Sequence, residues 1–220
     1  MGIIFQGYQY SAEQKETEQQ LIREKVDLEL QVIKNQLNPH FLFNTLNNID
    51  SFIKKDPGKA SDAVIKLSSI LRYQLYESDR EKIFLEQDIK IINDYLSLQR
   101  IRYWDNAIVR FEKMTGDSDL MIAPGIFIPF IENAFKHAPV NRKKTNIEIE
   151  LEARDSSIEF SIKKEKKGDS GNVAQTAGKG LGIGLARKRL EILYPDSYQL
   201  DIFDNETEFL VKLTINTVGV

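Results

Sequence analysis

His40 is the first residue in the sequence that could act as a chemical group acceptor. It belongs to a polar stripe with spacings of four, three and four, made of His40, Asn44, Asn47 and Ser51. The same spacings give an apolar stripe of Leu42, Leu46, Ile49 and Ile53. At about 100° per residue the stripes lie roughly 200° apart, so His40 should face solvent on a helix. An exposed neutral imidazole suits a nucleophile that a bulky donor must approach, although most such histidines are ordinary surface residues. Pro39 cannot donate to the carbonyl of Asn35, which predicts a bend just before His40.

A second group of polar residues falls in the segment PFIENAFKH. On a helix, one polar face would carry Glu132, Asn133, Lys136 and His137, flanked by apolar residues. A carboxylate, an amide oxygen and a cation can together position Mg²⁺ and phosphate oxygens. Taken alone, the same pattern is also that of a solvated helix face.

Glycine is concentrated near the C-terminus, since six of the 12 glycines fall within residues 168–184. The run that includes Gly180, Gly182 and Gly184 permits close backbone approach and leads into a predicted helix at 181–194. Free N–H groups and the helix dipole would meet there and could cradle phosphate. A glycine-rich hinge without a ligand is the alternative. The small, polar stretch 168–177 is typical of a mobile loop or lid.

The elements that must position these residues differ between the two halves of the chain. The first half is predicted to be helical, with a long exposed or coiled-coil-like helix near 13–36, a turn at 55–59 and a return helix on which Val64, Leu67, Leu71 and Leu75 form one stripe. Such a hairpin cannot enclose a core alone, so pairing of two copies into a four-helix bundle is expected.

The second half predicts a sheet with helices over one face. Apolar and polar residues alternate over 147–152, 158–162 and 209–215, which is typical of strands with one buried face. Helical patterns occupy about 86–102, 125–138 and 181–194. The fold class is therefore α+β, with a mixed or antiparallel sheet.

Composition excludes several classes of function. With 30 basic and 33 acidic residues the net charge is −3, which does not fit a generally basic nucleic-acid binder. Without cysteine there can be no disulfide, thiolate zinc site or iron–sulfur cluster, and two histidines cannot form a multi-histidine metal site. No apolar run approaches the roughly 18 residues of a membrane helix. The apolar opening MGIIFQGYQY is either the remainder of a membrane helix or a non-native leader.

The order of the three motifs resembles that of a known family. LNPHFLFNTLNNI resembles the phosphoacceptor motif of the LytS/YehU-type sensor histidine kinases. PFIENAFKHA is similar to the N-box of the GHKL ATP-binding domain, and GKGLGIGLARKRLEILYP to its glycine box. The resemblance covers roughly residues 30–215. It implies a signalling helix or membrane-proximal linker at 1–30, a dimerisation and phosphoacceptor hairpin at 31–82 and a GHKL (Bergerat-type) α/β sandwich at 83–220.

The resemblance also implies roles for the residues. His40 would be the phosphorylated residue, Asn44 its neighbour on the acceptor face and Glu132 a base-like residue near the reacting groups. Asn133 would bind Mg²⁺, and Lys136 and His137 would contact the phosphates of ATP. Gly180, Gly182 and Gly184 would shape the lid around the nucleotide. The partners would be a second copy of the chain and the receiver domain of a response regulator, with no direct contact to nucleic acid. The chain would be the cytoplasmic part of a bacterial inner-membrane protein, joined to the membrane only through an upstream segment.

One position departs from the family pattern. The family places an acidic residue or asparagine, which reads the adenine amino group, just after the second strand of the ATP domain. Here Lys164 takes that place. A lysine has no acceptor for an adenine N–H, although its flexible side chain can swing into solvent. The leading hypothesis is ATP-dependent autophosphorylation of His40 followed by transfer to a response regulator. The alternatives are a degenerate kinase that acts as a dimeric scaffold and a non-kinase GHKL module, which would not require the histidine motif.

Overall fold

A computed structural model describes residues 39–78, 80–103, 107–115, 120–136, 145–165, 181–205 and 207–217. The predicted helix at 13–36, the bend before His40, His137, Gly180 and the loop at 168–177 lie outside these residues. The chain divides into two compact units, Met1–Leu46 and Asn47–Val220. Among the described residues, none of the helices combines the length and the apolar character that crossing a bilayer requires.

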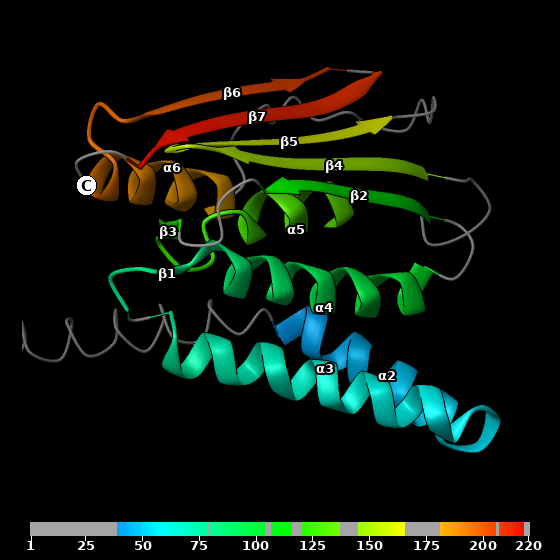
Figure 1. Ribbon diagram of the computed structural model, residues 1–220. Helices are drawn as coiled ribbons and strands as arrows, with labels where there is room; N and C mark the ends of the chain where they lie inside the picture. Colours follow the sequence, from blue (N-terminus) through cyan, green and yellow to red (C-terminus); the bar gives the residue numbers. More distant parts are fainter. Residues whose placement is uncertain are drawn as a thin grey trace, which may run out of the picture. The chain divides into compact units, whose positions relative to one another are not determined.

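Two helices form the N-terminal part of the described chain, as predicted. Helix α2 is Pro39–Lys55 and α3 is Pro57–Tyr76, and the chain reverses its direction between them (Figure 1). The reversal is fixed locally, because the side chain of Asp56 caps α3 by accepting a hydrogen bond from the backbone N–H of Lys59 at 3.1 Å. Pro57 suits the first turn of α3, where its missing N–H costs nothing.

The apolar residues of this helical pair are divided between two environments. Ile49 and Phe52 of α2 and Leu67 of α3 are buried within the chain. Other apolar side chains of the pair are 47% or more exposed: Phe43, Leu46, Ile53, Val64, Ile65, Leu75 and Tyr76. The stripes predicted for dimerisation therefore mix the two groups, because Ile49 and Leu67 already belong to the core of the single chain.

The rest of the chain is built around a five-stranded sheet in the order β2-β4-β5-β7-β6. Its strands are β2 (Ala107–Thr115), β4 (Thr145–Arg154), β5 (Ser157–Glu165), β6 (Tyr198–Asp204) and β7 (Glu208–Asn216). Strand β2 pairs in parallel with β4 and the other neighbours are antiparallel, so the sheet is mixed. The three predicted strands correspond to β4, β5 and β7.

Three helices cover one face of this sheet (Figure 1). They are α4 (Leu85–Tyr103), α5 (Ile128–Lys136) and α6 (Leu181–Leu193). The inward residues of the central strands are buried, whereas outward residues such as Glu150, Glu159 and Lys212 are exposed. A two-stranded ladder of β1 (Ile83–Phe84) and β3 (Met121–Ile122) lies beside them. The predicted α+β class, with helices on one face of a mixed sheet, is confirmed.

Candidate functional site

His40 lies in the first turn of α2, on the exposed side of the helix. The side-chain amide nitrogen of Asn44, one turn later, lies 3.1 Å from Nε2 of His40. Asn47 and Ser51 continue the exposed face, so the predicted solvent exposure of the polar stripe is confirmed for these residues.

The contact between Asn44 and His40 has a chemical consequence. An amide N–H can only donate, so the ring nitrogen that receives it must carry a lone pair. With the amide nitrogen of Asn44 as donor, the neutral imidazole carries its proton on Nδ1 and a lone pair on Nε2, whereas the opposite tautomer would require the amide oxygen in this place. In either arrangement Asn44 must release Nε2 before an electrophile can approach this atom.

Helix α5 supplies the second predicted site. Its apolar residues Phe130, Ile131, Ala134 and Phe135 are buried, whereas Glu132 and Asn133 are partly exposed. The rings of Phe127 and Phe130 pack on Phe160 of β5, at centroid distances of 4.8 and 6.4 Å. This aromatic packing fixes the helix over the sheet, so Glu132 and Asn133 lie on its accessible side. The side chain of Lys136 lies outside the described residues.

The described part of the glycine-rich segment is helical, as predicted for 181–194. Gly182 and Gly184 lie in the first turn of α6, and among the described residues only Gly125 is a glycine with positive φ. A Cβ atom built on Gly182 or Gly184 would meet nothing within 4 Å. Glycine in a helix costs roughly 0.5–1 kcal/mol relative to alanine, and protein packing gives no reason for either one. Open backbone at a helix N-terminus fits the close approach of an anion.

Lys164 lies on the helix-covered face of β5, in register with Ile147 of β4 and Phe209 of β7. Its exposed fraction is only 3%. The expectation that this side chain swings into solvent is therefore wrong, because the alternation of β5 turns it toward the core with Ile158, Phe160 and Ile162. The residues present fit phosphate and Mg²⁺ at α5 and α6, but a buried ammonium does not fit the amino group of adenine.

Three polar residues that hold the turn before α5 were not anticipated from the sequence. Asp88 of α4 accepts hydrogen bonds from the backbone N–H of Gly125, at 2.9 Å, and from the hydroxyl of Tyr73 of α3. The hydroxyl of Tyr194 accepts one from the N–H of Ala123 at 2.7 Å. Burial raises the pKa of Asp88, and it also raises the pKa values of Tyr73 and Tyr194. The available signal was an aspartate on the apolar side of α4, between Leu85 and Ile92.

Comparison with known proteins supports the motif analysis. The family model described as Histidine kinase matches residues 28–107. The sensor protein LytS of Staphylococcus epidermidis is 28% identical over 212 residues, which cover 92% of this chain and 35% of that protein. The LytS protein of Staphylococcus saprophyticus is 30% identical over 213 residues, with the same shares. The chain thus spans about a third of the length of these curated relatives.

A solved structure supports the fold. A protein described as a bacterial phosphotransferase superposes with a TM-score of 0.50 at 7% identity, covering 84% of this chain and 96% of that one. At that identity the likeness concerns the fold alone. The matches to the LytS proteins reach further, because they extend over 92% of the chain. The resemblance predicted from the three motifs is confirmed: the chain is similar to the LytS-type sensor histidine kinases over nearly its whole length.

Proposed function

We propose that this chain transfers the γ-phosphoryl group of ATP to His40 and from there to an aspartate in the receiver domain of a response regulator. The observation that carries the proposal is the exposed imidazole of His40, whose Nε2 is contacted by the side chain of Asn44 one turn later. Phosphoryl transfer depends mostly on positioning and charge stabilisation, so a well-oriented acceptor is a large part of what the reaction requires.

The transfer step conserves atoms and charge in a simple way. The lone pair on Nε2 forms the N–P bond while the bond from the γ-phosphorus to the bridging oxygen breaks, and ADP leaves. The imidazole ring then loses its Nδ1 proton to a base, for which the proposal names Glu132. The aspartate of the receiver domain subsequently attacks the phosphorus, the N–P bond breaks, and the ring takes back one proton from Glu132 or solvent, which regenerates the neutral histidine.

The nucleotide would bind between α5 and α6. The amide oxygen of Asn133 would hold Mg²⁺ together with phosphate oxygens, as this ion commonly binds in phosphoryl-transfer sites. Lys136 and His137 would contact the phosphates. Gly180 would extend the open backbone that Gly182 and Gly184 provide at the start of α6.

We further propose that the active species is a homodimer formed through the exposed apolar residues of α2 and α3. Self-association would cover these side chains in a four-helix bundle. The longer LytS relatives are consistent with a cytoplasmic kinase portion joined to a membrane segment upstream. No direct binding to nucleic acid is proposed, because the net charge of −3 does not favour it.

The proposal is tested by incubating the chain with γ-labelled radioactive ATP and Mg²⁺. The label should be labile in acid and stable in base, as expected for a phosphoramidate. His40→Gln should abolish the label and leave the circular dichroism spectrum unchanged. If the label persists in this variant, His40 is not the acceptor.

The second candidate is a degenerate kinase that acts as a dimeric scaffold. The buried Lys164 favours it, because a cation in the nucleotide site would weaken adenine binding. This candidate predicts a stable dimer that takes no label even with wild-type His40. The same incubation, run beside a measurement of molar mass, therefore separates the two candidates.

A further inference from the structure

The turn that precedes α5 is held by a buried polar contact to the helical hairpin. Asp88 of α4 is fully buried, and one of its oxygens, Oδ1, receives two hydrogen bonds. One donor is the backbone N–H of Gly125, in the turn before α5, and the other is the hydroxyl of Tyr73, near the end of α3. We name Tyr73, Asp88 and Gly125 the Asp88 junction.

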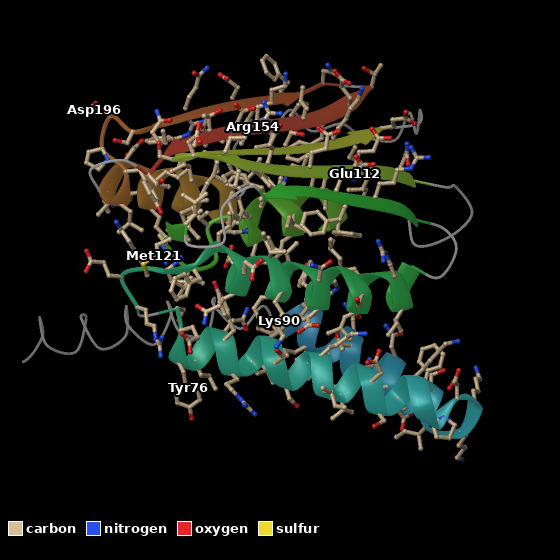
Figure 2. The ribbon with its side chains drawn as sticks, viewed as in Figure 1. Tyr76, Lys90, Glu112, Met121, Arg154 and Asp196 are labelled. Carbon is tan, nitrogen blue, oxygen red and sulfur yellow. The ribbon has the colours of Figure 1, made fainter. Side chains whose placement is uncertain are left out.

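The backbone and ring geometry make the junction close-fitting. Gly125 has a φ of +66°, a conformation that other residues rarely adopt. A Cβ atom built there would lie 3.9 Å from Cε1 and from the hydroxyl oxygen of Tyr73, so the tyrosine lies directly against the turn. Tyr73 thus contacts both α4 and the turn that starts α5, whereas Tyr76, one turn later, is 71% exposed and points away from α4 (Figure 2).

A buried carboxylate is not needed to stabilise this part of the core. Burying a carboxylate carries a large desolvation cost, and apolar side chains of similar volume often stabilise such a position as well or better. Within the described part of the chain, Oδ2 of Asp88 has no hydrogen-bond partner, which adds to the cost. Arg189 of α6 acts on Asp88 only through its charge. Two hydrogen bonds from different elements reach one oxygen of Asp88, and hydrogen bonds are directional. The buried carboxyl is therefore better explained by the fixed geometry that these bonds impose on α3 and on the turn before α5.

We propose that the Asp88 junction positions α5 relative to α3, so that movement of the hairpin is transmitted to the helix that carries Glu132 and Asn133. The inference rests on the proposed function for its consequence, since α3 follows α2, the helix that bears His40, after the turn at Asp56. The coupling itself rests only on contacts within Asn47–Val220. Asp88 is a positioning residue, because its hydrogen bonds go to Tyr73 and to the turn before α5 and not to a residue of the proposed reaction.

The first test measures the coupling without any activity. Hydrogen exchange of the full chain is compared for Tyr73→Phe, Tyr76→Phe and Tyr194→Phe. Tyr73→Phe should raise the exchange rates of both the end of α3 and the turn at 123–127, by roughly tenfold for the loss of one buried hydrogen bond. Tyr194→Phe removes a hydroxyl bonded to the same turn and should affect the turn but not α3. Tyr76→Phe should change neither, and faster exchange confined to one element in Tyr73→Phe would overturn the coupling.

The second test uses the phosphorylation of His40. Tyr73→Phe and Asp88→Ala should lower the rate constant of labelling about tenfold, with little change in the KM for ATP, because small displacements of reacting groups are costly. Asp88→Asn keeps a carbonyl acceptor at this position and should restore most of the rate. An unchanged or higher rate constant in Tyr73→Phe would contradict the positioning role. Absence of label in the wild-type chain would count against the proposed function, and the exchange test would still decide the coupling.

Discussion

The side-chain nitrogen of Asn44 lies 3.1 Å from Nε2 of His40, across one turn of α2. With the amide nitrogen as donor, this contact favours the tautomer whose lone pair is on Nε2. The relationship is local to one helix, so substitutions of Asn44 test it directly.

Asn44→Asp should impair phosphorylation of His40 more than Asn44→Ala does. A carboxylate accepts hydrogen bonds, so the aspartate variant would favour a proton on Nε2 and remove the nucleophilic lone pair. The alanine variant leaves both tautomers accessible. The aspartate variant should lose roughly 100-fold in the rate of labelling, the size of effect typical for a misplaced proton. Asn47→Asp, on the same exposed face, is the control for added negative charge, and an equal loss there would contradict the tautomer argument.

Self-association should depend on the apolar residues that the single chain leaves exposed. Ile53 and Val64 are 55% and 47% exposed, so covering each would contribute about 1 kcal/mol, half of the value for a fully buried aliphatic side chain. Ile53→Asp and Val64→Asp should give folded monomers by light scattering at tens of micromolar. Ile49 is unsuitable for this test, because it is buried within the chain and an aspartate there would unfold it.

Ile192→Asp, on the exposed side of α6, is the matched control for the dimer test, since its side chain is 68% exposed. It should leave the molar mass of the assembly unchanged. A wild-type chain that is monomeric at the same concentration would refute the proposed bundle.

The substitutions Glu132→Gln and Asn133→Ala should separate the transfer step from nucleotide binding. A carboxylate that accepts a proton acts in the transfer, so Glu132→Gln should lower labelling by about 100-fold and largely preserve the binding of Mg²⁺–ATP. An amide oxygen that holds the metal acts in binding, so Asn133→Ala should weaken the complex itself. Calorimetry and labelling, measured side by side, check both. Equal losses of affinity in the two variants would show that the roles are misassigned.

The stability of the chain should depend on pH through Asp88. Burial raises the pKa of this carboxyl above its ordinary value of 3.8, so the folded state favours the protonated form. The stabilisation is complete below that value and is lost as the pH rises through the raised pKa. Asp88→Asn cannot ionise, so the unfolding free energy of the wild type relative to this variant should fall as the pH is raised from about 4 toward neutrality. The fall is about 1.4 kcal/mol for each pH unit between the unfolded and the folded pKa of Asp88.

The two tyrosines near Asp88 do not titrate in the pH range of this measurement. Burial raises the pKa values of Tyr73 and Tyr194, which therefore stay protonated over this range of pH. Urea denaturation of the two proteins at several pH values gives the difference directly. A difference that is constant with pH, or that grows in favour of the wild type, would contradict the buried carboxyl.

The elements that could be predicted from the sequence are those whose apolar residues repeat with the period of a helix or of a strand. Strands β4, β5 and β7 alternate between buried and exposed residues, and α4, α5 and α6 were located to within a few residues. Strands β1 and β3 have two residues each, too few to show a period. Strands β2 and β6 were also missed, since each lies at an edge of the sheet and pairs with one neighbour only. The residues of β6 are mostly half-buried and so show no clear alternation.

In the candidate site, too, only the features that follow from local spacing could be predicted. The exposure of His40 follows from helical spacing alone, whereas the bond from Gly125 to Asp88 joins residues 37 positions apart. No local pattern encodes such a contact. The helix that holds Gly182 and Gly184 was predicted from its apolar spacing, although glycine disfavours helix.

Lys164 gives the sharpest prediction on the nucleotide itself. An acceptor that reads adenine supplies one buried hydrogen bond, and its loss costs about 1–3 kcal/mol, or roughly five- to 150-fold in affinity. The side chain of Lys164 is 3% exposed and so does not point into solvent; in the proposed adenine-reading position it would supply an ammonium in place of an acceptor. ATP and ADP should therefore bind weakly, with poor discrimination between adenine and guanine.

Lys164→Asp should tighten the binding of ATP more than that of GTP, because a carboxylate accepts the adenine N–H that an ammonium repels. Lys163→Asp is the matched control, since it makes the same change of charge one residue earlier, on the exposed face of β5. It should alter the two affinities equally. Calorimetry with both nucleotides measures the differences. If the unmodified chain instead binds ATP with low-micromolar affinity and selects adenine, another group reads the base, either Glu165 or a backbone carbonyl, and the assignment of Lys164 to this position is wrong.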